Sequence, residues 1–265
     1  MKRVFLTGAS SGIGLATVHA LLAQGHEVWG TARDPGRIPE IPHLHRMQLD
    51  LRDSRMVEEI FMRAWAEAGG LDVVINNAGS GRFGPAENMT ADAIADEFQV
   101  LLFAQLQVTQ LALRNMRARE AGLIINVTSL ASRLPVPFMA AYNAAKAAMA
   151  AFTMSIQLEL PQTGVNIVDL QPADIRTAFN NSVVKTDDAH YQEKVAKTWA
   201  AVVRNMNAAP KPKLVARLVL KLITQTNPPS RVTVGGGFQA KVAPLIFRFL
   251  PQRVRIWGLR KYYGI

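Results

Sequence analysis

The segment Arg3-Val-Phe-Leu-Thr7-Gly8-Ala-Ser-Ser-Gly12-Ile-Gly14 guides the interpretation of the whole chain. Its first five residues form a short, mostly apolar run that is typical of a buried strand. Three glycines follow within seven residues, and a helical pattern continues to about Gln24. A strand, a glycine-rich turn and a helix in this order are the setting in which glycines bind a dinucleotide. The segment therefore predicts a nucleotide site; the competing interpretation is a glycine-rich turn without a ligand.

The glycines of this turn are expected to have separate roles. Gly8 permits the tight turn, and Gly14 allows the helix to pack closely on the strand. Gly12 lets the backbone approach a pyrophosphate at the helix N-terminus, where N–H groups and the helix dipole favour anions. The residues expected around the cofactor here are Gly8, Ser10, Ser11, Gly12, Ile13 and Gly14.

A second informative segment runs from Asn126 to Lys146. Tyr142 and Lys146 are four residues apart in an Ala-rich run that should be helical, so both side chains project from one face. An ammonium group beside the phenol would lower the pKa of Tyr142 from its ordinary value of about 10. Ser129 adds a hydroxyl at the end of a strand-like run. The segment predicts a proton donor with a polariser; the alternative is an ordinary helical Tyr beside a solvated Lys.

The composition favours one large α/β domain. The chain has 265 residues, of which 49% are hydrophobic, so it can bury a sizeable core. It has no Cys and its five His residues are scattered, so we expect neither disulfides nor a metal site. No apolar run reaches the roughly 18 residues of a membrane span, and the N-terminus does not read as a signal peptide. The expected location is the cytoplasm.

The formal charge of +10 is concentrated near the C-terminus. Residues 238–265 contain no Asp or Glu, and their basic residues are Lys241, Arg248, Arg253, Arg255, Arg260 and Lys261. Apolar residues recur among these cations at helical spacing. Nucleic-acid modules more often spread cations along a groove with interleaved aromatics, so no nucleic acid is expected. We predict an apolar, basic helical extension that meets a membrane surface or a hydrophobic partner, or that folds back over the substrate pocket or a dimer seam.

Four motifs together resemble the short-chain dehydrogenase/reductase family. They are Thr-Gly-x-x-x-Gly-x-Gly from Thr7, Asn76-Asn77-Ala78-Gly79, Ser129, and Tyr142-x-x-x-Lys146. The resemblance covers about residues 1–235. It implies one Rossmann-like dinucleotide-binding and catalytic domain in residues 1–237, with 238–265 as its extension. It also implies a doubly wound parallel sheet with helices on both faces and a nicotinamide dinucleotide across the strand ends.

The same resemblance assigns chemistry to particular residues. Ser129, Tyr142 and Lys146 would be catalytic, and Tyr142 and Lys146 would also contact the cofactor. The family motifs further imply cofactor contacts from Asn77, Ala78, Gly79, Pro172 and Thr177. An Asp at the end of the third strand contacts the adenine in this family, which implicates Asp50 and its neighbour Leu51, although Asp50 could instead cap the next helix.

The end of the second strand bears on which dinucleotide is bound. The family usually places an acidic residue there in NAD enzymes, and in this chain that position is Ala32. Arg33 comes next, and a guanidinium suits a 2′-phosphate. The sequence therefore favours NADP(H) over NAD(H); the alternative is a solvated Arg33 in a loop.

The chain departs from the family pattern at two positions. Leu101 stands where many members carry an Asn that holds a water near the catalytic Lys, and Ala173 replaces a usual Gly. Leu101 has no polar side-chain atom, so we expect Gln105, one turn later, to take part in that water relay.

Two predicted helices and one irregular segment complete the pattern. Ala91–Arg117 is expected to be one long helix, and Ala140–Leu160 another that is rich in Ala. Together they suggest the family's helical interface of a homodimer or homotetramer. Residues 174–210 are expected to form either a mobile lid over the site or a packed helical pair.

The sequence thus predicts an oxidoreductase that transfers a hydride between NADP(H) and a carbonyl/alcohol pair. Apolar loops and the extension suggest a small hydrophobic substrate. Two alternatives stay open: a cofactor-binding protein of low activity that acts as a sensor or scaffold, and a peripheral membrane-binding protein.

Overall fold

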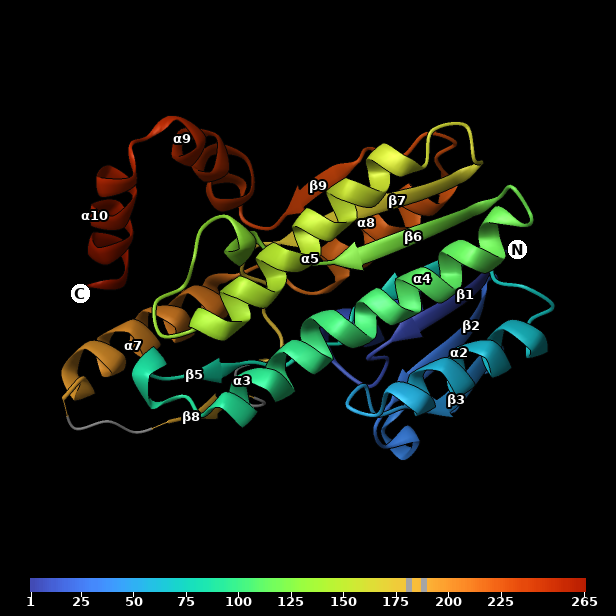
Figure 1. Ribbon diagram of the computed structural model, residues 1–265, viewed down its shortest axis with the longest axis horizontal. Helices are drawn as coiled ribbons and strands as arrows, with labels where there is room; N and C mark the ends of the chain where they lie inside the picture. The colour runs from blue at the N-terminus through green and yellow to red at the C-terminus, as the bar shows by residue number, and fades with distance from the viewer. Residues whose placement is uncertain (180–182, 187–189) are drawn as a thin grey trace.

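The computed structural model of the protein describes residues 1–179, 183–186 and 190–265 (Figure 1). Its centre is a seven-stranded parallel sheet in the order β3-β2-β1-β4-β6-β7-β9. The strands are β1 (Arg3–Thr7), β2 (Glu27–Ala32), β3 (Leu44–Gln48), β4 (Val73–Asn76), β6 (Gly122–Val127), β7 (Val165–Pro172) and β9 (Arg231–Val234). The strand order reverses between β1 and β4, which is where doubly wound sheets bind ligands.

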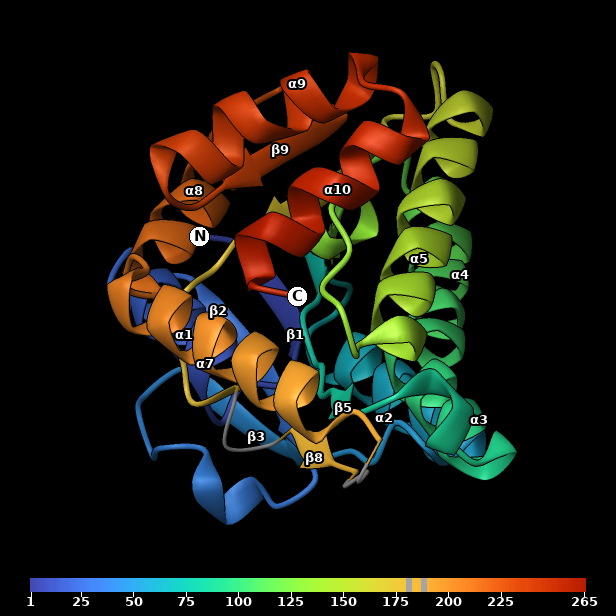
Figure 2. The ribbon, with the colours of Figure 1, turned by 90° about the vertical axis from the view of Figure 1, so that its left-hand side faces the viewer.

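Helices cover both faces of this sheet, as expected (Figures 1 and 2). The helices are α1 (Gly12–Leu22), α2 (Ser54–Glu67), α3 (Ala91–Phe98), α4 (Ala104–Arg117), α5 (Ala140–Glu159), α7 (Gln192–Ala208), α8 (Lys213–Thr224), α9 (Ala243–Phe249) and α10 (Gln252–Tyr263). The core on one face joins the strands to α2, α4 and α5, and the core on the other joins them to α1 and α8.

Strand β1 shows how the sequence fills both cores. Phe5 packs in the core under α2 and α4, whereas Val4 and Leu6 pack in the core under α1 and α8. Successive side chains of a strand point to opposite faces, and a parallel sheet is buried on both. The unbroken apolar run at the N-terminus is therefore what a central strand requires.

The region 91–117 is not one regular α-helix, and that expectation is corrected. A π-helical turn, η3 (Gln99–Phe103), separates α3 from α4. Such a turn adds one residue to the helical repeat and loosens its backbone bonding. Gln105 compensates locally, because its Nε2 donates to the Val100 carbonyl at 3.2 Å. Leu101 lies in this turn and is fully buried.

In the described part of the segment 174–210, residues Gln192–Ala208 form the helix α7, which packs on neighbouring segments of the chain. Trp199 of α7 meets the Phe83 ring at a centroid distance of 4.8 Å, and the Lys185 ammonium lies 3.9 Å from the Trp199 ring centre. Phe83 and Lys185 belong to two short strands that pair with each other, β5 (Arg82–Phe83) and β8 (Val184–Lys185). Residues 180–182 and 187–189 of this segment lie outside the described residues.

The chain after β9 forms a helical extension at the outer edge of the sheet (Figure 2). A π-helical turn, η5 (Phe238–Val242), leads into α9, and Pro251 separates α9 from α10. Across the described residues, no helix combines the length and the apolar content needed to span a bilayer.

Candidate active site

Thr7 at the end of β1 joins the glycine-rich turn to the Asn-Asn-Ala-Gly motif. Its hydroxyl accepts hydrogen bonds from the backbone N–H groups of Asn77 and Ala78, each at 3.0 Å. The Asn77 side chain returns the contact, because its Nδ2 donates to the carbonyls of Thr7 at 2.9 Å and Gly8 at 3.3 Å. Two motifs about seventy residues apart are thereby locked together at the carboxyl edge of the sheet.

The glycine positions leave room that no other residue would leave. Gly8 and Gly12 have φ of +75° and +54°, a region that side-chain-bearing residues rarely adopt. A Cβ on Gly14 would collide with the Gly8 carbonyl oxygen and approach Asn77 Nδ2 to 2.7 Å. Thr177 lies beside the turn, 3.4 Å from where a Gly12 Cβ would stand. This cradle fits the close backbone approach that a dinucleotide diphosphate requires.

Three more residues, which are predicted to contact the cofactor, end or follow strands at the carboxyl edge of the sheet. They are Asp50, Leu51 and Pro172. Asp53 caps α2, because its Oδ1 accepts from the N–H groups of Arg55 and Met56, so Asp50 is not the helix cap. The Leu51 side chain is buried in the core, so only its backbone is available to a cofactor. Pro172 ends β7 at the same edge as Thr177.

The end of β2 separates the roles of Arg33 and Asp34. Asp34 Oδ1 accepts a hydrogen bond from Gly36 N at 2.9 Å, which fixes this carboxylate in the turn that follows the strand. The Arg33 side chain is exposed directly after β2. The first charged group beyond this strand is therefore a guanidinium.

Ser129, Tyr142 and Lys146 come together where β6 meets α5. The Ser129 side chain lies near enough to the Tyr142 hydroxyl to lower the pKa of Tyr142. Lys146 is buried, and its Nζ donates to the Val127 carbonyl at 2.9 Å. Ser129 Oγ also accepts from Ala131 N at 3.1 Å, which fixes the turn after the strand. The predicted juxtaposition of the two hydroxyls is present.

The acid–base state of this group differs from the expectation for Tyr142. Burial raises the pKa of Tyr142, and the hydrogen bond from Ser129 opposes that rise; the charges of Glu97 and Asp174 raise it further. Burial lowers the pKa of Lys146 to about 8, while the Asp169 carboxylate works against this fall. The predicted lowering of the Tyr142 pKa by Lys146 is thus opposite in direction to the shift that this structure shows, because desolvation of the phenolate outweighs the other contributions.

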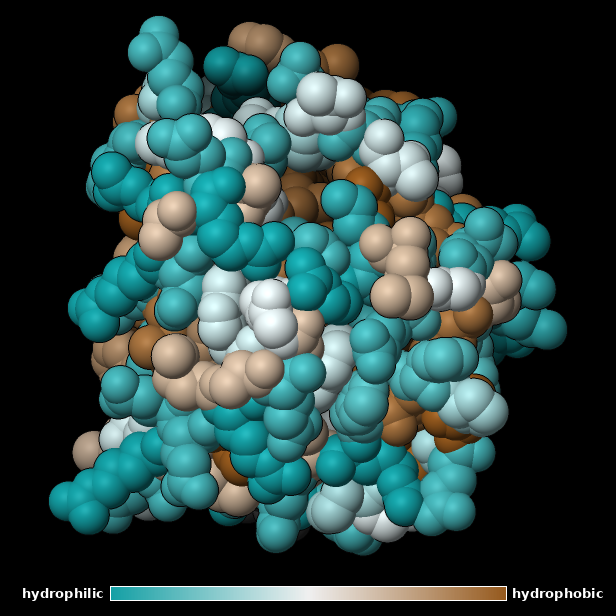
Figure 3. All heavy atoms as spheres, turned by 90° about the vertical axis from the view of Figure 1, so that its right-hand side faces the viewer, coloured by the Kyte–Doolittle hydropathy of each residue, from teal (hydrophilic) through white to brown (hydrophobic). Residues whose placement is uncertain are grey.

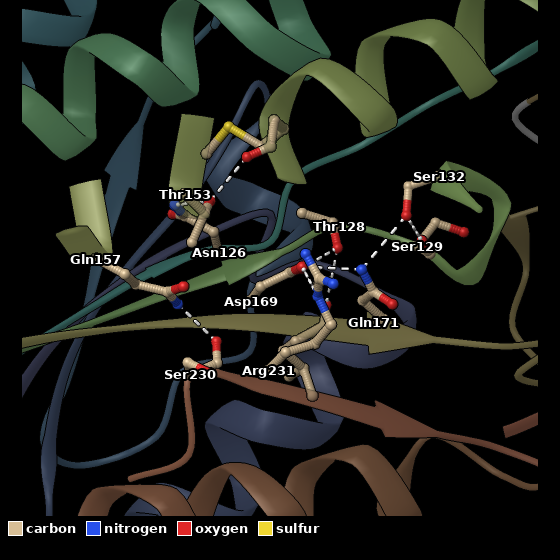
Figure 4. Close-up of polar contacts among 12 residues, drawn as sticks. Asn126, Thr128, Ser129, Ser132, Thr153, Gln157, Asp169, Gln171, Ser230 and Arg231 are labelled. Atoms are coloured by element: carbon tan, nitrogen blue, oxygen red, sulfur yellow. Dashed lines mark hydrogen bonds and ion pairs between the residues drawn. The ribbon is translucent and has the colours of Figure 1, made fainter. Parts of the chain in front are cut away.

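A buried polar network behind the site was not predicted from the sequence (Figure 4). The Asp169 carboxylate accepts from Thr128 Oγ1, from Arg231 Nε at 2.7 Å and from Gln171 Nε2 at 2.8 Å. Gln171 Nε2 also contacts Ser132 Oγ at 3.4 Å, and Ser132 Oγ donates to the Ser129 carbonyl at 2.7 Å. The signal was two polar residues at i and i+2 inside an apolar strand, which places them on one face of β7.

Gln105 is buried beside the Asn-Asn-Ala-Gly motif. Its Nε2 donates to the Ala78 carbonyl at 2.7 Å as well as to Val100, so the amide braces the Asn-Asn-Ala-Gly turn. Leu101 lies against the same turn, with its Cδ2 3.5 Å from the position of a Cβ on Gly79. Packing by Leu101 and a direct amide–carbonyl bond from Gln105 thus hold this turn, and the water relay stays a prediction.

Two acidic residues near Tyr142 were also missed. Glu97 is 3% exposed, and its Oε1 accepts from Arg82 N at 3.1 Å. Burial raises the pKa of Glu97 to about 7. Asp174 Oδ2 accepts from Gln239 Nε2 at 2.7 Å, and burial raises the pKa of Asp174. Gln239 belongs to the C-terminal extension, so this bond ties the extension to the site.

A cavity of about 340 Å³ opens beside Thr177. Its lining residues are Arg176, Thr177, Lys185, Trp199, Val203, Met206 and Asn207. Two of its lining residues, Arg176 and Lys185, are cations, so the cavity suits an anionic ligand. In the ranges that the structure describes, no three His, Cys, Asp or Glu side chains are grouped in a way that would hold a metal ion.

Comparison with known proteins decides the family. Residues 2–188 match the model of the short chain dehydrogenase family. The chain belongs to this family. It is therefore an oxidoreductase of a group whose solved members bind nicotinamide dinucleotides, among them a metagenomic short-chain oxidoreductase in complex with NADP that is 28% identical, with a TM-score of 0.71 over 88% of this chain and 96% of that one.

The similarity between this short chain dehydrogenase and known proteins can extend over nearly the whole of its chain. It is 28% identical over 266 residues to a 3-ketodihydrosphingosine reductase of Bacteroides thetaiotaomicron, covering 99% of this chain and 98% of that protein. It is 32% identical over 198 residues to an NADPH carbonyl reductase 2 of Sus scrofa, covering 73% and 79%. A short-chain dehydrogenase from Streptomyces avermitilis superposes with a TM-score of 0.83 at 25% identity, covering 98% and 93%.

Proposed function

We propose that the protein is an NADP(H)-dependent oxidoreductase that interconverts a hydrophobic ketone and its alcohol. The observation that carries the proposal is the closeness of Tyr142 to Ser129, with buried Lys146 on the same helix, at the sheet edge that holds the glycine cradle. Two hydroxyls and a lysine at that edge form a proton donor and an oxyanion site for a carbonyl oxygen.

In this mechanism the bound nicotinamide supplies the hydride. Tyr142 donates its proton to the oxygen of the reacting carbonyl, and Ser129 donates a hydrogen bond to the same oxygen. Lys146, with a pKa of about 8, is largely protonated near neutral pH and keeps a positive charge at this end of α5. Its ammonium would also hold the ribose hydroxyls of the nicotinamide side.

The preference for NADP(H) rests on the end of β2. Ala32 offers no carboxylate to the ribose, and the Asp34 carboxylate is bonded to Gly36 N. The exposed Arg33 guanidinium is then the group that would pair with a 2′-phosphate. Gly8, Ser10, Ser11, Gly12, Ile13, Gly14, Asp50, Leu51, Asn77, Ala78, Gly79, Pro172 and Thr177 are proposed to complete the cofactor site.

An aromatic cluster near Tyr142 supports a hydrophobic substrate. The Phe179 ring lies 5.8 Å from the Tyr142 ring. Three more rings form a chain of contacts with Phe83, at centroid distances of 4.8 to 6.2 Å; these are Phe138, Tyr191 and Trp199. The full-length likeness to a reductase named for a keto lipid base agrees with a ketone that carries an apolar chain.

The decisive experiment is the oxidation of NADPH and of NADH with ketones of increasing chain length. We expect kcat/KM to rise with chain length and to be higher with NADPH. A protein that binds NADPH tightly yet reduces none of these ketones would instead be a sensor or scaffold, and the proposal would be wrong.

The proposed assembly is a homo-oligomer through α4 and α5. These helices lie side by side on one face of the molecule, and Phe103, Met154 and Leu158 on or beside them are exposed (Figure 1). A homodimer or homotetramer would bury this apolar surface. The proposed compartment remains the cytoplasm.

A further inference from the structure

The C-terminal extension exposes a continuous apolar stripe. Phe238, Val242, Leu245 and Phe249 recur at spacings of four, three and four residues, so they lie along one side of η5 and α9. Phe238 is 65% exposed, Leu245 60% and Phe249 75%. Side chains of this size rarely stand together in solvent on a monomer unless they meet a partner.

Helix α10 adds an aromatic side chain and further cations to the same region. Trp257 is 61% exposed, and the Lys261 ammonium is 5.3 Å from its ring centre. All the charged side chains of residues 238–265 are positive. Trp beside Lys and Arg, with a bulky apolar stripe, is the side-chain combination that favours a membrane–water interface.

Polar contacts on the extension hold its shape. Gln239 Nε2 donates to Asp174 Oδ2 at 2.7 Å and to the Tyr262 hydroxyl at 3.0 Å, which ties both η5 and α10 to the site. Arg255 donates to the carbonyls of Leu250 at 2.7 Å and Arg248 at 3.1 Å, which fixes the turn between α9 and α10. The extension is therefore a built surface and not a loose tail.

The opposite side of the molecule has a different character. Figure 3 faces the side away from the extension, and hydrophilic side chains cover most of it. The extension in Figure 2 instead lies at the side where the parallel strands end. The exposed apolar stripe and the unopposed positive charge of the extension thus lie on the side of the molecule that carries the site.

We propose that residues 238–265 dock the protein on a membrane that contains anionic lipid, with α9 and α10 lying in the headgroup region. Charge selects this occupant: six cations without an acidic residue are attracted to an anionic lipid surface. A second copy of the chain, paired through the same surface, would oppose like charges. The helices are too short to cross the bilayer, so they lie on it. This docking does not depend on which ketone is reduced.

The test is flotation of the full chain with vesicles of phosphatidylcholine alone or mixed with phosphatidylserine. We expect binding to the anionic vesicles at low salt, little binding to the neutral ones, and release at high salt. The variant R253Q/R260Q should bind the anionic vesicles roughly thirtyfold more weakly, because each surface cation contributes about 1 kcal/mol.

A matched control separates local docking from net charge. The variant R114Q/R117Q loses the same charge from exposed positions on α4, and it should bind vesicles like the unmodified protein. The variant L245S/F249S should lose at least about tenfold in binding, because the apolar stripe no longer inserts. All three variants should keep their thermal unfolding temperature and their turnover of a short, water-soluble ketone.

Three results would overturn the proposal. The first is no binding of the unmodified protein to anionic vesicles at low salt. The second is an equal loss in R253Q/R260Q and R114Q/R117Q, which would show attraction by net charge only. The third is an L245S/F249S variant that differs from the unmodified protein in oligomeric mass but binds vesicles equally well. That result would identify a second copy of the chain as the occupant of the stripe.

Discussion

Helices α8 and α9 have similar apolar side chains and opposite surroundings. Val215 and Val219 of α8 are buried against the sheet, whereas Leu245 and Phe249 of α9 stand mostly in solvent. Both helices show apolar residues at helical spacing. The spacing reports that a helix forms, but the sheet decides whether its apolar side is covered. In the body of the protein, such helices pack on the sheet that carries the site. In the extension, the apolar side of such a helix faces solvent.

This difference predicts that catalysis and surface binding respond to separate substitutions. Tyr142→Phe should lower turnover by about 10²–10⁴-fold, because it removes the proton donor and leaves the ring. NADPH affinity, measured by Trp fluorescence, and vesicle binding should stay unchanged. Turnover within twofold of the unmodified protein would show that Tyr142 is not the acid.

The pH dependence of the free energy of unfolding tests the buried site separately from the exposed extension. The pKa of Glu97 in the folded protein is about 7, above its ordinary value of 4.5, so the folded state holds more protons than the unfolded state between these values. The free energy of unfolding should therefore fall as pH rises from about 4.5 to 7, by up to roughly 3 kcal/mol, and then level off.

Glu97→Gln removes this titration. Urea unfolding at a series of pH values should show that the variant gains on the unmodified protein as pH rises through the same window. A hydrogen bond weakened in the variant would change its free energy of unfolding by the same amount at every pH. The quantity to compare is therefore the slope of the free energy of unfolding against pH. Parallel curves for the two proteins would contradict the assignment. The extension has no acidic residue, so nothing in it titrates in this window.

Arg33, Arg253 and Arg260 are all exposed, yet their effects should differ. Arg33→Ala should weaken NADPH binding by about tenfold to a hundredfold, since a hydrogen bond to a charged group contributes about 1.5–3 kcal/mol. NADH binding should change much less. Fluorescence titration of both cofactors checks this, with R253Q/R260Q as the comparison that leaves both affinities alone. Tighter NADH than NADPH binding by the unmodified protein would refute the preference.

Glycine-to-alanine substitutions provide the smallest effects, with opposite signs in the two regions. Gly14→Ala puts a Cβ against the Gly8 carbonyl and should cost about 1–3 kcal/mol, a fall of several degrees in Tm. Gly258 of α10 has open space around its Cβ position, so Gly258→Ala should stabilise that helix by up to about 1 kcal/mol. Calorimetry and amide exchange of α10 measure the two. A loss of exchange protection in Gly258→Ala would contradict the open packing.

Local sequence patterns predicted those parts of the fold that depend on short-range chemistry. Strand β9 (Arg231–Val234) is a short run rich in β-branched residues between turn residues, a local pattern that specifies a strand. The family, the parallel sheet and the two-sided helical cover were also confirmed. The π-helical turn at Gln99–Phe103 was missed, since one extra residue in a helix leaves no mark on composition.

The site was only partly predictable for a similar reason. Ser129, Tyr142 and Lys146 could be proposed from spacing, and the structure places Ser129 near enough to Tyr142 to act on its pKa. The raised pKa of Tyr142 could not be foreseen, because it depends on burial. Asp169 and Asp174 acquire their partners from Arg231 and Gln239, more than sixty residues away, so no local pattern marks them.

The strand order has a consequence for how the chain folds during synthesis. In the order β3-β2-β1-β4-β6-β7-β9, every strand joins the free edge of a sheet that the earlier strands have already formed. No strand has to be inserted between two that are paired, so the sheet can grow outward as the ribosome delivers it, N-terminal strands first. From β4 onward, the free edges of this sheet are β3 and the newest strand. The extension follows β9, so its apolar helices leave the ribosome after every strand of the sheet.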